Sequence, residues 1–338
     1  MNSVEVACAA AQRLSKDSLV LTFLLLRSSF SLFSAVITLV LMFLEKFTKH
    51  YHPNAVVLLR GYLFFTILAA LSTVFCDGTD VIRFLILRPT GRHCPIHLYY
   101  GKTAELMLMP TVFSMNALGI MFIFIGIERS IATVYASTYE KMKSSVPGWL
   151  LLLVATVASA GKAYWFYSQS NVDRYNPMST VGDIPLGVQQ TALGIQLGIE
   201  IINVIVFTAL YVCNKRSLNG SRRVLSTLAY KYQINENMNS LTMILHLAWF
   251  HCVITILATV VILFSIAFFT EEEYLRYGLP TDLYPFYHCV FPVLFGFKIF
   301  QERRQKRKMI VTTAEERKEY KNQDVHFKML GHLFEKPE

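Results

Sequence analysis

Long apolar runs recur along the 338 residues of the chain and constrain its fold most. A helix needs about 20 apolar residues to cross the hydrocarbon core of a bilayer. Hydrophobic residues make up 54% of the chain and charged residues 16%, with a mean hydropathy of +0.41, which is unusual for a soluble protein. We predict an all-α membrane protein, a bundle of seven transmembrane helices at residues 19–44, 55–75, 103–127, 147–167, 188–213, 237–270 and 283–300.

Positive charges are distributed unevenly between the connecting segments. An odd number of spans puts the two termini on opposite sides of the membrane. Residues 214–237 and the tail at 301–338 hold most of the cationic excess. Because cytoplasmic loops are enriched in Lys and Arg, we expect residues 1–18 outside and the tail inside. The net charge of +9 then indicates an anionic inner leaflet as the partner, rather than nucleic acid.

The third predicted helix ends on adjacent opposite charges, Glu128 and Arg129, which are followed by a polar segment. Charges at the end of a span can simply anchor the helix in the headgroup region. Alternatively, Arg129 is free to bond toward the cytoplasm or to a neighbouring helix. Because sequence neighbours point to different faces of a helix, a more distant carboxylate such as Glu236 is a candidate partner for Arg129.

The fifth predicted helix carries a polar stripe. Gln196, Glu200 and Asn203 follow one another at intervals of four and three residues, which places them on one face. An ionised carboxylate in mid-membrane is costly unless it is protonated, paired or beside a wet cavity. The stripe is either one wall of a ligand pocket or a polar contact between helices. His251 and His288 are either packing residues or ligand contacts, and the second interpretation gains weight if one of them faces Glu200.

The segment between the second and third predicted helices, 76–102, is the longest connection expected outside. Cys76 and Cys94 bracket it in an oxidising compartment, and we predict a disulfide between them. Cys8 is a rival partner for either cysteine, and two free thiols are a further alternative. Arg27, in the outer part of the first predicted helix, can extend its charged end to the membrane interface.

Several motifs resemble those of a nematode chemoreceptor superfamily, which contains the serpentine receptor classes alpha, alpha-beta, beta and epsilon. They are IERSIATVYASTYEK at 127–141, YQINEN at 232–237, YHPN at 51–54 and DVHFKMLGHLFE at 324–335. The last motif favours class epsilon, with class alpha-beta second. The NPxxY motif of rhodopsin-like receptors is absent from the seventh predicted helix, which carries Pro292 instead.

The resemblance implies a G-protein-coupled chemosensory receptor in the plasma membrane, in the cilia of sensory neurons. It implies a small environmental or pheromone-like ligand, with Gln196, Glu200, Asn203, His251 and His288 as candidate contacts. Glu128, Arg129 and Glu236 become candidates for coupling to a heterotrimeric G protein. The alternative function is a multi-pass transporter or a ligand-gated channel. The sequence contains no motif of an enzyme, a cofactor site or a metal site, and we expect none of the three.

Overall fold

The computed structural model contains two compact units, residues 1–293 and 294–338. The described part of the second unit is helical and consists of residues 294–298, 300, 301 and 304. Over the whole chain the structure describes residues 3–44, 52–85, 94, 96–139, 144–170, 174–179, 185–221, 228–269, 273–278, 282–298, 300, 301 and 304.

Six helices in the described residues are long and apolar enough to cross a membrane. They are α2 (Ser18–Phe43), α3 (Pro53–Leu85), α4 (Gly101–Val134), α6 (Val146–Ser168), α7 (Leu186–Ser221) and α8 (Leu228–Phe268). Each one covers most or all of a predicted span. Residues 284–298 are also helical and coincide with the seventh predicted span.

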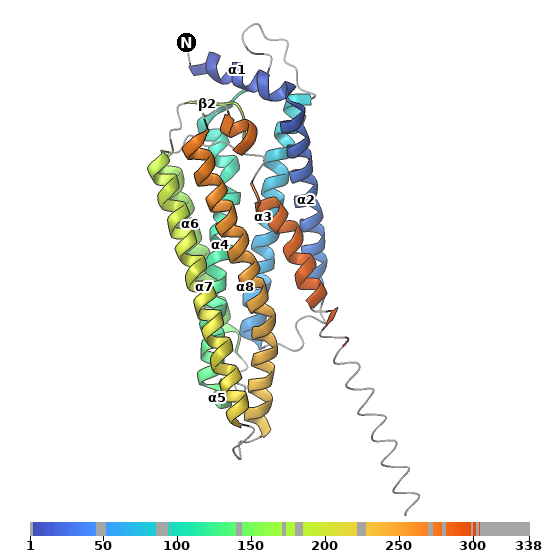
Figure 1. Ribbon diagram of the computed structural model, residues 1–338, viewed down its shortest axis with the longest axis vertical. Helices are drawn as coiled ribbons and strands as arrows, with labels where there is room; N and C mark the ends of the chain where they lie inside the picture. The colour runs from blue at the N-terminus through green and yellow to red at the C-terminus, as the bar shows by residue number, and fades with distance from the viewer. Residues whose placement is uncertain are drawn as a thin grey trace, which may run out of the picture. The chain divides into compact units, whose positions relative to one another are not determined.

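The long helices of the first unit run side by side as a bundle (Figure 1). Helix α4 is the central element, because it packs against α3, α6, α7 and α8. The other large contacts join α2 to α3 and α7 to α8. The short helix α5 (Ala136–Tyr139) follows α4, so we call that end of the bundle the α5 end. We call the opposite end, where α2 begins, the α1 end.

The α1 end carries a small layer that the sequence does not predict. Helix α1 (Ser3–Lys16) lies across this end in Figure 1, beside the strand pair of β1 (Tyr99–Tyr100) and β2 (Tyr175–Asn176). A short π-helix, Tyr274–Gly278, follows α8. Apolar residues of α1 pack with residues of α2, α3 and the connecting segments in one buried cluster: Ala7, Cys8, Ala11, Leu14, Val20, Leu24, Val81, Phe84, Ile96, Leu98 and Met178.

Helix α3 continues well beyond its predicted end at residue 75. The charged residues that suggest an outer loop there, Asp77, Asp80 and Arg83, are buried in α3 instead. Arg83 Nη2 lies 2.9 Å from Asp80 Oδ1, and Asp80 Oδ2 accepts hydrogen bonds of 2.9 and 2.8 Å from the backbone N–H and the hydroxyl of Ser179. Buried charges that are paired and hydrogen-bonded in this way can continue a helix inside a protein.

Candidate functional site

The α5 end contains a buried acid–arginine–tyrosine cluster. Arg129 Nε lies 2.5 Å from Glu128 Oε2, and Nη2 donates a 2.6 Å bond to Glu128 Oε1. The hydroxyl of Tyr139, at the end of α5, donates to the same carboxylate. Burial raises the pKa of the Tyr139 phenol, and the neighbouring Glu128 charge raises it further, so the phenol keeps the proton that it donates.

This geometry corrects the expectation that Glu128 and Arg129 point apart. Both side chains are long enough to fold back into the same buried space, where they are 3% and 5% exposed. The alternative partner, Glu236, has a helical backbone in α8, but its side chain lies outside the described residues. Tyr139 is a member of the cluster that the sequence does not single out, although it lies in the motif at 127–141.

Two residues of the YHPN motif, His52 and Asn54, make contacts at the α5 end of the bundle. The ring of His52 lies 4.0 Å from that of Tyr139, measured between centroids. Asn54 Oδ1 accepts a 3.1 Å hydrogen bond from the backbone N–H of Gly148, near the start of α6. A Cβ at position 148 would lie 2.9 Å from the Cα of Asn54, so this close approach requires glycine. The motif therefore holds α3, α5 and α6 together beside the Arg129 cluster.

A second buried polar cluster surrounds Glu200 of α7. Its Oε1 accepts a 2.8 Å hydrogen bond from Gln196 Nε2 and lies 2.9 Å from His251 Nε2 of α8. Asn203 donates a 3.1 Å bond to the carbonyl of Gly119 in α4, and Lys162 of α6 lies 3.5 Å from Gln196 Oε1. The stripe thus makes contacts between four helices, and one of the two predicted histidines does face Glu200.

Aromatic contacts join the Glu200 cluster to the last helix of the first unit. The ring of His251 lies between those of Phe122 and Tyr287, at centroid distances of 5.3 and 4.8 Å. The hydroxyl of Tyr287 is hydrogen-bonded to that of Tyr62 in α3. His288 does not contact Glu200 in the described residues; instead it lines a cavity nearer the α1 end.

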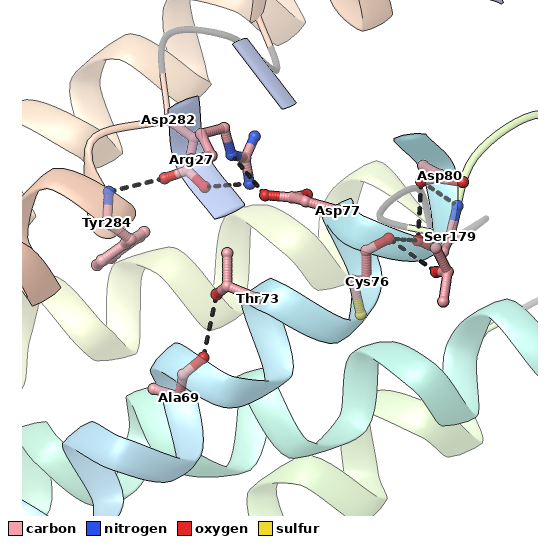
Figure 2. A network of polar contacts seen from close by, with 10 residues as sticks. Arg27, Ala69, Thr73, Cys76, Asp77, Asp80, Ser179, Asp282 and Tyr284 are labelled. Carbon is pink, nitrogen blue, oxygen red and sulfur yellow. Dashed lines mark hydrogen bonds and ion pairs between the residues drawn. The ribbon is translucent and has the colours of Figure 1, made fainter. Parts of the chain in front are cut away.

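That cavity has a volume of about 150 Å³ and is formed around Arg27. The guanidinium lies between two carboxylates, with Nε 3.2 Å from Asp77 Oδ2 and Nη2 3.2 Å from Asp282 Oδ2 (Figure 2). Asp282 is held in turn by a 3.0 Å hydrogen bond from the backbone N–H of Tyr284. Arg27 is only 8% exposed, so the expectation that it extends to the membrane interface is wrong.

The predicted Cys76–Cys94 disulfide is also wrong. Cys94 is bonded to Cys8, the rival partner, and Cys76 is a buried free thiol. Because α3 continues past residue 76, the Cys76 side chain stays inside the bundle, where Sγ donates to the carbonyl of Met107. Helix α1 brings Cys8 over the α1 end, where Cys94 lies.

Sequence reasoning singles out Arg27 but finds neither of its carboxylate partners, because it assigns Asp77 to a loop and does not single out Asp282. It also does not single out Tyr287, whose ring lies 4.8 Å from that of His251. One indication was available: a lone arginine in an apolar helix requires a buried carboxylate unless it reaches the interface. Candidate partners could therefore have been sought among the aspartates at the outer ends of the other helices.

Comparison with known proteins agrees with this architecture. The chain is similar to the serpentine receptor class alpha/beta-14 of Caenorhabditis elegans, with 22% identity over 99% of this chain and 94% of that protein. A family model described as "Serpentine type 7TM GPCR receptor class ab chemoreceptor" matches residues 5–330. The predicted superfamily is confirmed, and the preference for class epsilon is corrected to the second choice. The chain therefore belongs to the class ab family of serpentine seven-transmembrane chemoreceptors.

Proposed function

We propose that this multi-pass membrane protein is a G-protein-coupled chemosensory receptor of the plasma membrane, located in the cilia of sensory neurons. It binds a small environmental or pheromone-like molecule and activates a heterotrimeric G protein. The observation that carries the proposal is the buried Glu128–Arg129–Tyr139 cluster at the end of α4, in a chain of a chemoreceptor family. The family is described as a receptor class, which supports a receptor over the alternative of a transporter or channel.

The cluster has the properties of a restrained coupling group. A guanidinium is always charged and has five N–H donors in a planar fork. In this conformation Glu128 binds it through both carboxylate oxygens, and Tyr139 occupies one of them as well. If ligand binding separates α5 from α4, Glu128 loses the bond from Tyr139. Arg129 can then rotate toward the carbonyl groups of a G-protein segment that enters the α5 end.

The proposed orientation puts the α1 end outside and the α5 end in the cytoplasm. The Cys8–Cys94 disulfide supports it, because disulfides persist in oxidising compartments. The cationic excess of residues 214–237 and of the tail also supports this orientation, because cytoplasmic segments are enriched in Lys and Arg. In this orientation, a ligand from the environment enters at the α1 end and lies above the Glu200 cluster.

The ligand contacts that we propose are Gln196, Glu200, Asn203, His251 and His288. The Glu200 cluster is buried below the α1 end and joins α4, α6, α7 and α8, so a ligand that displaces one partner of Glu200 changes the contacts between these helices. Its contacts also agree with a purely structural role, in which the cluster only holds the helices together.

Substitution of Arg129 tests the coupling role. We expect Arg129→Ala to reach the cell surface and to lose agonist-driven second-messenger responses, and Arg129→Lys to be impaired because an ammonium lacks the planar fork. Arg60→Ala, which removes an exposed arginine of α3, is the matched control and should signal normally. Normal signalling by well-expressed Arg129→Ala would leave the cluster as an anchor of the helix end.

The same assay identifies the group that restrains Arg129. Tyr139→Phe removes the phenolic hydrogen bond to Glu128 and should raise basal activity. Glu236→Ala should raise basal activity only if the Glu236 side chain also reaches Arg129. A rise in the first variant alone would assign the restraint to α5, and a rise in the second alone would assign it to α8.

A further inference from the structure

The cavity around Arg27 has an unbalanced charge. Among the described residues that line it, Arg27 is the one cation, and Asp77 and Asp282 are the two carboxylates. The neighbouring pair Asp80–Arg83 is balanced within itself. A single guanidinium therefore faces two carboxylates, one on the fully buried Asp77 and one on Asp282, whose side chain is 23% exposed, and one negative charge is left without a countercharge. Such a charge is costly unless a cation compensates it.

Unused hydrogen-bond acceptors line the same cavity. Asp77 is fully buried, and its Oδ1 has no hydrogen-bond partner among the described residues. His288 is 1% exposed, and neither of its ring nitrogens has a hydrogen-bond partner in that part of the chain. A neutral imidazole has one acceptor nitrogen, so the cavity offers a carboxylate oxygen and a ring nitrogen to a donor. Polar side chains this deeply buried are normally satisfied.

The remaining lining residues favour a small organic cation over a hydrated ion. Leu108, Met115 and Ile262 give the cavity an apolar part. Tyr274 and Tyr284 also line it, and aromatic rings attract cations. A cavity of about 150 Å³ in another protein holds one benzene ring, which sets the size of the hydrocarbon that fits.

We propose that this cavity binds a small primary amine in its protonated form, with a hydrocarbon part of about one ring. The ammonium donates to Asp77 and to the His288 ring, and the hydrocarbon lies against the apolar wall. This inference rests on the proposed receptor function and names the chemical class of its ligand. Of the five ligand contacts proposed above, His288 is the one that lines this cavity.

The test measures binding to the purified full-length receptor directly, as the rise in unfolding temperature with added probe. The probes are cyclohexylamine and cyclohexanol, which match in shape and differ in charge. We expect the amine to stabilise the receptor at concentrations at least about tenfold lower than the alcohol, because it adds a charge-assisted hydrogen bond. Asp77→Asn should abolish this preference for the amine.

Asp80→Asn is the matched control, since it removes a carboxylate of the same helix that does not line the cavity, and it should keep the preference. Each variant is compared with its own unfolding temperature without probe, so a loss of stability does not obscure the result. Equal potency of the two probes on the unsubstituted receptor, or an amine preference that survives Asp77→Asn, would overturn the inference.

Failure of this inference and failure of the proposed function give different results. If neither probe stabilises the receptor but another compound activates a G protein through it, the amine site is wrong and the receptor function stands. If the amine binds as expected but no G protein responds to any bound compound, the site stands and the coupling proposal is wrong.

Discussion

The Cys8–Cys94 disulfide gives the most direct quantitative prediction. The bond joins residues 86 positions apart and fixes α1 to the segment before β1. In the chain-entropy model, closing a loop of this length stabilises the folded state by about 4.5 kcal/mol. This is an upper limit, because helices that remain in the detergent micelle already restrict the unfolded chain. At roughly 2 °C per kcal/mol for a large domain, loss of the bond should lower the unfolding temperature by up to 9 °C.

The assay is thermal unfolding of the purified receptor in detergent, followed by intrinsic tryptophan fluorescence, which does not depend on the cysteines. Cys8→Ser, Cys94→Ser and the double variant should all show the same decrease, because each removes the same bond. Cys76→Ser is the matched control and should change stability by only about 1 kcal/mol, since serine can still donate to the Met107 carbonyl.

Two results would refute this assignment. One is a non-reduced peptide map that joins Cys76 to Cys94. The other is a large loss of stability in Cys76→Ser together with an unchanged Cys8→Ser. The first result would mean that α3 ends near residue 75, as the sequence alone suggests, and the second would mean that Cys8 is not bonded to Cys94.

Three further predictions concern the bundle. Gly119→Ala should lower stability by about 1 kcal/mol in thermal unfolding, because the new Cβ would lie 2.6 Å from Gln196 Nε2 and break the bond of Gln196 to Glu200. The control is Gly161→Ala, whose Cβ would have no neighbour within 4 Å among the described atoms, and it should be neutral or stabilising. Glu200→Gln should reduce ligand responses more than surface expression, and equal losses would support a structural role. An epitope added after Glu338 should be labelled only in permeabilised cells, and labelling of intact cells would reverse the proposed orientation.

The spans could be predicted because long apolar runs have few structural alternatives. The end of α3 could not, because Asp77, Asp80 and Arg83 have the composition of a loop, and only their partners make them helical and buried. The partners of the two aspartates, Arg27 for Asp77 and Ser179 for Asp80, are distant in sequence, and no local pattern connects them. The motifs that carry the resemblance identify the superfamily more sharply than the class, so they do not separate class epsilon from class alpha-beta.

Helix α1 is different, because its pattern is visible in the sequence. Its buried residues Ala7, Cys8, Ala11 and Leu14 follow the spacing of one helical face. The segment is short and too polar to cross a membrane, so a search for spans does not detect it. It covers the α1 end of the bundle instead. Recognising it would have favoured Cys8 as the partner of Cys94, since a helix over the α1 end brings that thiol to the outer segments.

The polar clusters also show why ligand contacts and structural contacts are hard to separate in a membrane bundle. Lipid is as apolar as a helix surface, so burial of apolar area contributes little to helix association, and packing and polar contacts decide it. Glu200 bonds to a neighbour on α7 and faces His251 of α8, and the adjacent Asn203 binds the backbone of α4. Any substitution there removes a helix contact together with any ligand contact. The informative quantity is therefore the ligand response per receptor at the cell surface. The cavity around Arg27 gives a cleaner test of ligand recognition, because Asp77 Oδ1 and the His288 ring have no hydrogen-bond partner there among the described residues.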